Sequence, residues 1–351
     1  MKPDYDIIMF GLIRTDFKLS STSVAWAKEW AKTNRVFYID RPYSIKDVRE
    51  NWKLPAFKKR MNALFFGKDL YEPNQFGLPD FVQVTPRITL PLNFLPDGVV
   101  YNILNRFNNY MVTLAIRRII RDNKVEKYIY FNSFHPVLCP FVPLSVKPQP
   151  LANIYQSLDE ISEEPYIARH GVMAEKFAVK YCDIAIGTST KLCKRLSEES
   201  QRKVRLLANA ADFHTFENAM NKDLPKPDAF TQFTKPVIIY TGHYSDLRMD
   251  HDLVIKLAKV FSDHEMVFVG TFDEADREKY GLNKIQNLHF LGSRPIEQLP
   301  ACLKYSKLPS SHIKGIRLPK EFIRSKLMST SQRAFLVFRP ILVQTWMRLK
   351  R

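Results

Sequence analysis

Short apolar runs alternate with segments of helical period along most of the chain. Near the N-terminus, the apolar run in DYDIIMFGLI ends at Gly11, and SSTSVAWAKEWAKTN follows with hydroxyl residues and then apolar positions at helical spacing. RVFYIDRP is a second apolar run, which Pro42 ends. A strand, a glycine turn, a capped helix and another strand form a βαβ unit, which predicts a parallel sheet.

The alternation continues to about residue 223. Further strands are expected in KYIYFNSF, LANIYQSLD, DIAIGTS and KVRLLANAAD, and helices in 99–122, SEEPYIARHGVMAEKFAVKYC and TKLCKRLSEES. Residues 43–98 are predicted to be irregular, because they are rich in Pro, Lys and aromatic residues. Residues 224–236, LPKPDAFTQFTKP, contain three prolines and no apolar period, so they are predicted to be a linker.

A second α/β series follows the predicted linker, in PVIIYTG, DHDLVIKLAKVFS, HEMVFVG, NLHFLG and PIEQLPACLKYS. The chain is therefore predicted to be an α/β protein with two Rossmann-like domains, the second incomplete: domain 1–223, linker 224–236, partial domain 237–306 and a basic tail 307–351. Ligands of such folds bind at the carboxyl ends of the strands. Five glycines are expected at this edge: Gly11, Gly187, Gly242, Gly270 and Gly292. The alternative for each is that it only makes the tight turn from strand to helix.

Composition places the chain among ordinary globular proteins, with 45% hydrophobic and 25% charged residues. No apolar run is long enough for a membrane-spanning helix, and the acidic N-terminus is unlike a signal peptide, so a cytoplasmic protein is expected. The four cysteines have no metal or redox spacing and are expected to be reduced packing residues. No GxGxxG or Walker A motif is present, which argues against dinucleotide and NTPase sites.

The net charge of +17 comes mostly from the tail. Residues 307–351 contain eleven Lys or Arg and one acidic residue, Glu321, so they carry +10 and leave +7 for residues 1–306. The regular strand and helix pattern stops at the same point. Nucleic-acid binding is disfavoured, since no recognisable module accompanies the charge.

Several segments of residues 5–306 together resemble the GT-B glycosyltransferases, especially retaining enzymes that build cell-envelope polysaccharides. The likeness lies in DIAIGTSTKLCKRL, KVRLLANAADFHTF, PVIIYTGHYSDLRMD, VFVG and NLHFLGSRPIEQLPACLKYS. In the segment N-G-V-D-x-x-x-F of that family, this chain has Asn209, Ala210, Ala211, Asp212 and Phe216. The resemblance implies transfer of a sugar from a nucleotide-diphosphate sugar, without a metal or another cofactor.

The same resemblance implies donor and acceptor residues. Gly242, His243, Arg248 and Gly270 are the donor-side candidates, because a glycine turn and a cation stabilise the leaving diphosphate. An alternative for Arg248 is a surface ion pair with Asp246 or Asp250. Gly11, Arg14 and Asp16 are the acceptor-side candidates. The candidates for catalysis or sugar contact are Asp159, Glu160, His135 and His170, and each histidine has a structural alternative.

The acceptor is expected to be a polysaccharide or a lipid-linked glycan. FKKRMNALFFGK interleaves cations with apolar residues, as membrane-interface segments do, although a solvated basic loop has the same composition. A peripheral contact with the inner face of the cell membrane is therefore one expectation.

The tail has a second reading in another frame. Permitted codons for residues 315–330, read two bases later, encode NTFTKGIYPLKINEY, and the flanking residues permit IIPYKG before it and LSAGVP after it. The combined string resembles the donor-site region of the family, including its ribose-binding glutamate. The tail is therefore expected to be an out-of-frame translation, and the activity of this chain to be low or absent.

Two alternatives remain open. One is a non-catalytic protein that associates with anionic membrane surfaces, and the other is a sugar-nucleotide epimerase of the same fold.

Overall fold

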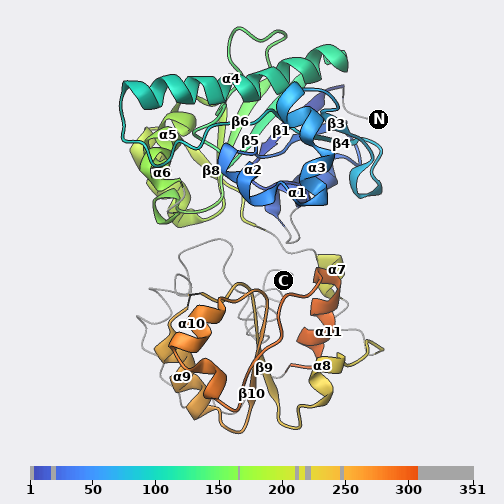
Figure 1. Ribbon diagram of the computed structural model, residues 1–351, viewed down its shortest axis with the longest axis vertical. Helices are drawn as coiled ribbons and strands as arrows, with labels where there is room; N and C mark the ends of the chain where they lie inside the picture. The colour runs from blue at the N-terminus through green and yellow to red at the C-terminus, as the bar shows by residue number, and fades with distance from the viewer. Residues whose placement is uncertain are drawn as a thin grey trace, which may run out of the picture. The chain divides into compact units, whose positions relative to one another are not determined.

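A computed structural model describes residues 4–16, 21–164, 167–209, 213–217, 223–245 and 249–306, and the chain divides after Asn209 into two compact units (Figure 1). The first unit contains β1 (Asp6–Gly11), α1 (Thr22–Trp30), β2 (Val36–Ile39), α2 (Ile45–Asn51), α3 (Pro55–Lys59), the π-helical turn η1 (Asn62–Phe66), β3 (Tyr71–Glu72), η2 (Gln75–Gly77), β4 (Phe81–Val84), α4 (Val99–Asp122), β5 (Tyr128–Ser133), β6 (Ala152–Ser157), η3 (Ile161–Glu163), α5 (Ala168–Tyr181), β7 (Ile184–Gly187), α6 (Thr190–Ser200) and β8 (Val204–Leu206).

The sheet of the first unit has the strand order β3-β4-β2-β1-β5-β6-β7-β8, and all neighbours are parallel except β3 and β4. The chain builds the sheet outward from β1 in both directions, so β1 and β5 meet at a topological switch point. In the β1–β5 register, Gly11 is opposite Ser133. Ligands of open α/β sheets bind at the carboxyl edge of such a point.

Successive side chains of the central strands point to opposite faces of this sheet, and both faces are buried. Ile8 and Phe10 pack with α4 on one face, whereas Ile7 and Met9 pack with α1 on the other. Strands covered on both faces are apolar throughout, which explains why DIIMFG and VFYI lack a polar face. The two layers of helices hold the carboxyl edge of the sheet in place.

The second unit has a three-stranded parallel sheet in the order β11-β10-β9. One face packs against α9, and the other against α8 and α11. Its elements are α7 (Phe213–Glu217), α8 (Asp228–Thr231), β9 (Val237–Thr241), α9 (His251–Val260), β10 (Glu265–Val269), α10 (Glu274–Lys279), η5 (Leu282–Lys284), β11 (Leu288–Phe290), η6 (Ile296–Gln298) and α11 (Leu299–Lys304).

Two predictions for loops are wrong. Residues 43–98 contain helices and the strand β4, which pairs with β2, because Phe81 is buried against Tyr38 on the sheet. The segment predicted as a linker, 224–236, belongs to the second unit: it contains α8, whose Phe230 is fully buried in that unit's core.

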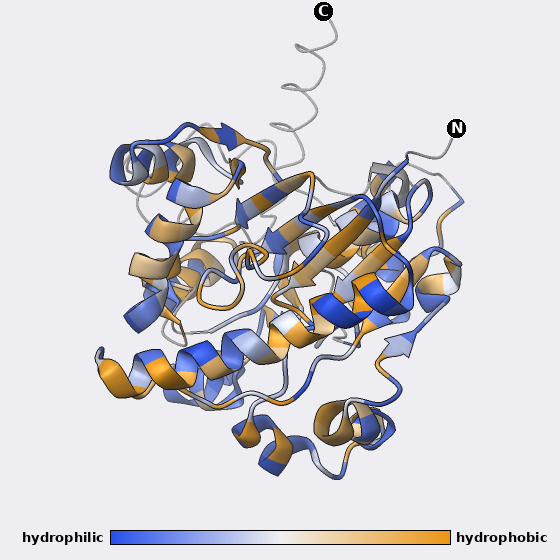
Figure 2. Cartoon of the chain, turned by 90° about the horizontal axis from the view of Figure 1, so that it is seen from above, coloured by the Kyte–Doolittle hydropathy of each residue, from blue (hydrophilic) through white to orange (hydrophobic). Residues whose placement is uncertain are grey.

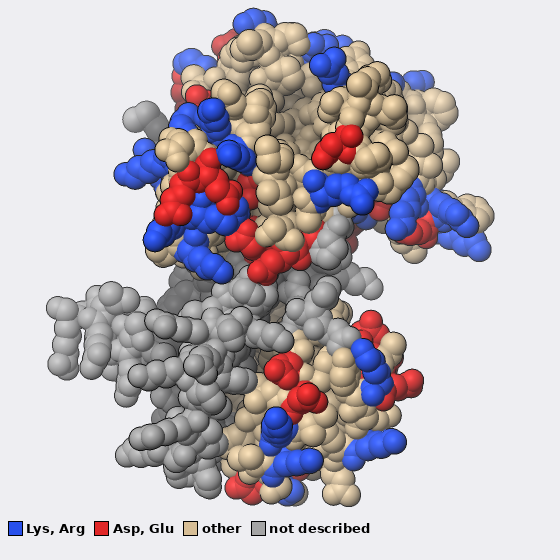
Figure 3. Space-filling model, turned by 90° about the vertical axis from the view of Figure 1, so that its left-hand side faces the viewer, with Lys and Arg blue, Asp and Glu red and all other residues tan. Residues whose placement is uncertain are grey.

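The cysteine prediction is confirmed, because all four are free and buried. Within the described residues, no helix is both long and apolar enough to cross a membrane. On the side of the molecule seen in Figure 3, basic and acidic side chains are interspersed over the described residues of both units. Residues 307–351, and with them the predicted tail, lie outside the described residues.

Candidate functional site

The switch point of the first sheet brings together the side chains that follow β1 and β5. Gly11 ends β1, and the loop through Arg14 and Asp16 leaves from it, while His135 comes two residues after β5. Asp159 comes two residues after β6, the next strand. The strands are parallel, so these predicted residues follow strand ends on the same edge of the sheet.

Position 11 requires glycine because the side chain of Tyr38 lies directly against its backbone. A Cβ atom at this position would overlap the hydroxyl of Tyr38, which is fully buried. That hydroxyl donates to the carbonyl oxygen of Ile13 over 2.7 Å and is 3.0 Å from the hydroxyl of Ser23. The phenol therefore holds the start of the loop that carries Arg14 and Asp16.

The predicted acceptor-side residue Asp16 belongs to a buried ionic cluster around Arg60. One guanidinium nitrogen of Arg60 lies 2.5 Å from Asp16, another 3.9 Å from Asp40, and its Nε 3.7 Å from Glu72. The Arg60 side chain is only 6% exposed. Arg14 lies 3.9 Å from Asp16, and its guanidinium lies over the ring of Tyr43 at 4.1 Å.

Asp40 is the most perturbed carboxyl group of this cluster. Burial raises its pKa to about 7, against the opposing effects of the hydrogen bond from the Thr15 backbone and the charge of Arg60. Its oxygens accept from the Thr15 N–H over 2.9 Å and from Gln83 Nε2 over 2.8 Å. Asp40 therefore holds the loop that follows β1, through its hydrogen bond with Thr15. The sequence analysis missed Asp40 and Arg60, although a carboxylate directly after a buried strand was a visible signal.

A cavity of about 150 Å³ opens at the switch point. It is lined by Leu12, Arg41, Thr89, Leu90, Leu92, Asn93, Tyr101, Asn105, Asn108, His135, Val137, Leu138, Ile167 and His170. Both predicted histidines thus reach one cavity, although they are far apart in sequence. Six of these residues are aliphatic and seven carry polar or charged side chains, so the cavity combines apolar walls with several hydrogen-bonding groups, as small-molecule sites do.

The two histidines of this cavity differ in their hydrogen bonding. His170 lies with Nδ1 2.8 Å from Asp97 and Nε2 3.0 Å from the Leu95 carbonyl oxygen, and its ring stacks on Tyr101 at 3.7 Å. His135 stacks on Phe10 at 5.0 Å, and its buried Nδ1 has no hydrogen-bond partner within the described part of the chain. Burial lowers the pKa of His135 to about 3, so the ring is neutral. His170 forms part of the wall, and His135 is the histidine with hydrogen-bonding capacity left for a ligand.

Glu160 is held by a cation that the sequence analysis did not identify. Arg195 of α6 lies 2.8 Å from Glu160, 3.2 Å from Glu175 and 2.8 Å from Glu199. Glu175 also accepts from the hydroxyl of Ser157 over 2.6 Å, and burial raises its pKa. The geometry therefore gives Glu160 a role in fixing the loop after β6, beside Asp159.

In the second unit, the turns after β9 and β10 are in contact. Gly270 has φ +148°, and a Cβ there would overlap the carbonyl oxygen of Gly242. Only glycine fits this close approach. His243 Nδ1 lies 2.8 Å from the hydroxyl of Thr271, and Gly242 donates its N–H to the Val269 carbonyl over 3.0 Å. Three of the four predicted donor-side residues are therefore neighbours, and the fourth, Arg248, lies outside the described residues.

The helices that follow these turns are already capped by carboxylates. Asp250 accepts from the N–H of Leu253 at the start of α9, and Asp273 from the N–H of Ala275 at the start of α10. An anion at this edge would therefore meet the turns themselves rather than two free helix ends.

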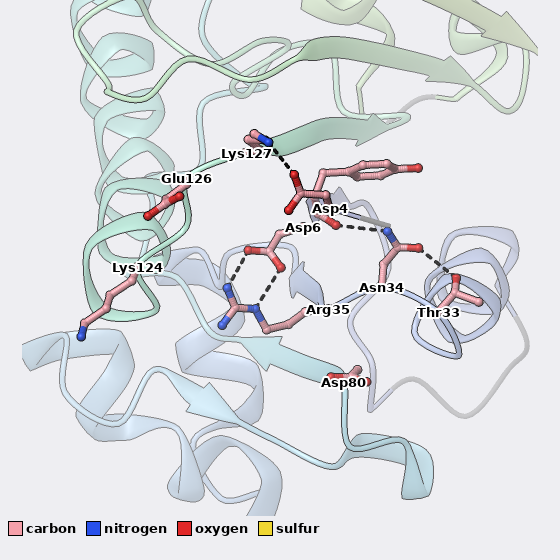
Figure 4. Close-up of a pocket in the computed structure, with 10 residues that line it drawn as sticks. Asp4, Asp6, Thr33, Asn34, Arg35, Asp80, Lys124, Glu126 and Lys127 are labelled. Atoms are coloured by element: carbon pink, nitrogen blue, oxygen red, sulfur yellow. Dashed lines mark hydrogen bonds and ion pairs between the residues drawn. The ribbon is translucent and has the colours of Figure 1, made fainter. Parts of the chain in front are cut away.

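A larger cavity of about 290 Å³ lies at the opposite, amino edge of the first sheet (Figure 4). Its main charges are paired with one another: Arg35 makes two hydrogen bonds to Asp6, of 3.0 and 2.6 Å, and Lys127 lies 2.5 Å from Asp4. None of the predicted site residues lines it. These pairs join the starts of β1, β2 and β5 and have a structural role.

No protein-family model matches the chain, and no curated protein matches its sequence. Solved structures match its fold. The apo structure of OtsA has a TM-score of 0.52 at 7% identity, with 86% of this chain and 76% of that chain covered. An α,α-trehalose 6-phosphate synthase from Burkholderia multivorans has a TM-score of 0.50 at 9% identity, with 86% and 75% covered. A trehalose-6-phosphate protein from E. coli, bound with UDP-2-fluoro glucose, has a TM-score of 0.50 at 8% identity, with 86% and 77% covered. The chain has the two-domain Rossmann-like fold called GT-B.

Proposed function

We propose that the chain is built as a glycosyltransferase, which moves a sugar from a nucleoside diphosphate sugar to a hydroxyl of a glycan or lipid-linked acceptor. The observation that carries the proposal is the cavity at the switch point of a GT-B fold, with the neutral His135 in its lining. A structure of the same fold was solved with a UDP-sugar analogue, which supports this class of donor.

The proposed chemistry divides between the two units. Cleavage of the bond between the sugar and the diphosphate develops negative charge on the leaving phosphate, and backbone N–H groups and a cation stabilise it. The contacting turns that carry Gly242, His243 and Gly270 take this role together with Arg248, and the N–H groups of Gly242 and Gly270 hold the turns by bonding to the carbonyls of Val269 and Gly292. The departing phosphate then accepts the proton of the acceptor hydroxyl, so the reaction needs no metal and no separate strong base.

In the first unit, His135 and Asp159 are proposed to contact the sugars. A neutral imidazole exchanges hydrogen bonds with a hydroxyl without a fixed charge, and its pKa of about 3 keeps it neutral throughout the physiological range. Arg14 and Asp16 are proposed to lie beside the acceptor. The ion pair of Asp16 with the buried Arg60 keeps their loop in position.

The experiment is hydrogen exchange on the full chain with UDP-glucose and, separately, with a GDP-sugar. Protection of residues 240–245 and 268–273 supports the proposal. In a chain whose donor-site region has been restored, His135→Ala should remove transfer without removing this protection. Absence of protection with every nucleotide sugar would contradict it and favour the interaction protein. Release of free nucleoside diphosphate with an altered sugar, and no need for an acceptor, would indicate the epimerase.

We also propose that residues from about Lys307 onward are an out-of-frame translation, which leaves this chain with little activity. The test is a restored chain, in which IIPYKGNTFTKGIYPLKINEYLSAGVP replaces the residues from Pro309 to Phe335. Transfer activity should rise in the restored chain relative to the original. Gene codons that cannot yield the second reading would contradict the proposal.

A further inference from the structure

Helix α4 has a second apolar surface in addition to the one that it buries. Its inner side packs on the sheet through residues such as Val112, Ile116 and Ile119. On its outer side, five large apolar residues are between 43% and 74% exposed: Val99, Val100, Ile103, Phe107 and Tyr110. At about 100° per residue these five fall within an arc of about 100°, so they form one stripe along the first three turns.

The same arc becomes basic in the second half of the helix. Arg117, Arg118 and Arg121 continue it, and Figure 2 shows α4 changing from hydrophobic at one end to hydrophilic at the other. Arg117 donates to the neutral Ser145 hydroxyl over 2.9 Å and Arg118 to a backbone carbonyl, whereas Arg121 pairs with Asp122 over 2.7 Å. Three arginines beside one carboxylate leave this half of the helix with an excess of positive charge. We call the five apolar residues and these three arginines the α4 surface.

A second segment adds apolar side chains beside the basic half. Arg118 donates to the carbonyl of Gly67, which anchors the end of η1 against α4. Phe65 and Phe66, at this end of η1, are 43% and 66% exposed. Two segments that are far apart in sequence therefore place exposed aromatic residues and arginines together.

We propose that the α4 surface docks on an anionic lipid bilayer, with its apolar half at the boundary between headgroups and acyl chains and its arginines on lipid phosphates. Exposed aliphatic and aromatic side chains next to arginines match this boundary in both polarity and charge. A second copy of the chain is a poorer fit, because it would bring the same arginines to a shared interface.

The docking has a consequence for the cavity at the switch point. Tyr101, Asn105 and Asn108, on the inner side of the first turns of α4, line that cavity. A bilayer on the outer side of these turns would lie within the width of one helix from the cavity. The inference itself stands whether or not the chain transfers a sugar.

The test uses the full chain with a fluorescent label at one position, because such a label reports whether its own position enters the bilayer. Binding through the basic residues 307–351 alone would therefore not give the expected signal. Because all four native cysteines are buried, a single exposed cysteine can be labelled selectively. An environment-sensitive label on Ile103→Cys should shift to the blue with vesicles of phosphatidylcholine and phosphatidylglycerol. The same label on Met173→Cys, which starts from a 69% exposed residue of α5, should not shift.

Charge is tested separately. The pair Arg117→Glu and Arg121→Glu should weaken the response of the Ile103→Cys label to these vesicles by about thirtyfold or more. The control pair Lys191→Glu and Lys203→Glu changes the net charge equally on another surface of the first unit and should leave the response nearly unchanged. A label at position 103 that stays in water with anionic vesicles would overturn the proposal. So would a lipid-free dimer that Phe107→Ser dissociates.

Discussion

Asp40 makes the stability of the first unit depend on pH in a direction unusual for a carboxyl group. Its pKa is raised from 3.8 to about 7 by burial, so folding favours its protonated form. Its contribution to stability is complete below about pH 4 and is lost as the pH rises to about 7. A shift of about three units, at about 1.4 kcal/mol each, corresponds to about 4 kcal/mol.

The perturbation is Asp40→Asn, which keeps the shape and the oxygen that accepts from Thr15 and cannot ionise. Between pH 4 and pH 8, the free energy of unfolding of the native chain should fall by about 4 kcal/mol relative to the variant. The assay is denaturant unfolding followed by tryptophan fluorescence. Of the four tryptophans, Trp26, Trp30 and Trp52 lie in the first unit, so the signal reports that unit.

The control is Asp122→Asn at the end of α4. A hydrogen bond from Arg121 lowers the pKa of Asp122, so its contribution should have the opposite sign. It should also be small, because the pair is exposed. If the difference between the native chain and Asp40→Asn does not change with pH, Arg60 keeps Asp40 ionised and the reasoning from burial is refuted.

Three further changes test the cores and the edges. Gly270→Ala should destabilise the second unit and expose residues 240–245 to hydrogen exchange, because the new methyl group overlaps the Gly242 carbonyl; unchanged exchange would contradict the contact. Phe230→Ala should lower the free energy of unfolding of the second unit by about 3–5 kcal/mol in denaturant titrations, whereas a true linker residue would cost almost nothing. Arg195→Met should lower the free energy of unfolding of the first unit by about 3 kcal/mol in denaturant titrations, because it leaves the buried carboxylate of Glu175 without its cation. Adding Glu175→Gln to this variant should recover part of the loss, because the carboxylate is then absent.

Long elements, in which the apolar pattern repeats many times, could be predicted from the sequence, whereas short elements could not. The helix 99–122 was predicted with its observed bounds, because its apolar repeat extends over many turns. The strand β4 was missed, because four residues among prolines carry little local signal and gain their stability from pairing with β2. Phe230 and Phe233 were missed for the same reason: three prolines surround them, and only their burial in the core reveals the short helix.

For the candidate site, the sequence placed His135 and Asp159 after strands at the carboxyl edge of the sheet, where the structure has them, and gave no sign of the buried ionic cluster. His135 could be placed because it follows a strand directly, and strand ends are where α/β folds bind ligands. Arg60 could not, since it stands in a run of cations that is typical of a solvated loop, yet it is buried among carboxylates contributed by three different segments. Long-range pairing of this kind leaves no periodic trace in the sequence.

In the second unit, the helix starts after β9 and β10 are capped and the turns before them lack cations, so a phosphate-binding cation must come from another position. The turns 242–245 and 270–273 contain no Lys or Arg, and Asp250 and Asp273 occupy the helix starts that follow them. Two arginines follow strands of this unit in the sequence: Arg248, seven residues after the end of β9, and Arg294, four residues after the end of β11. Burial raises the pKa of the Cys302 thiol of α11, and the nearby charge of Arg294 opposes this rise, which associates Arg294 with the α11 side of the sheet.

We therefore propose Arg248 as the cation of the donor chemistry. In the restored chain, Arg248→Ala should weaken binding of UDP-glucose by about ten- to a hundredfold in calorimetry, the amount expected for one charge-assisted hydrogen bond. Arg294→Ala should change it by less than about threefold. Because both variants remove one positive charge from the same unit, a general electrostatic effect would weaken binding equally in both. The reverse order would assign the diphosphate to the β11 turn and contradict the role given to Gly242 and Gly270.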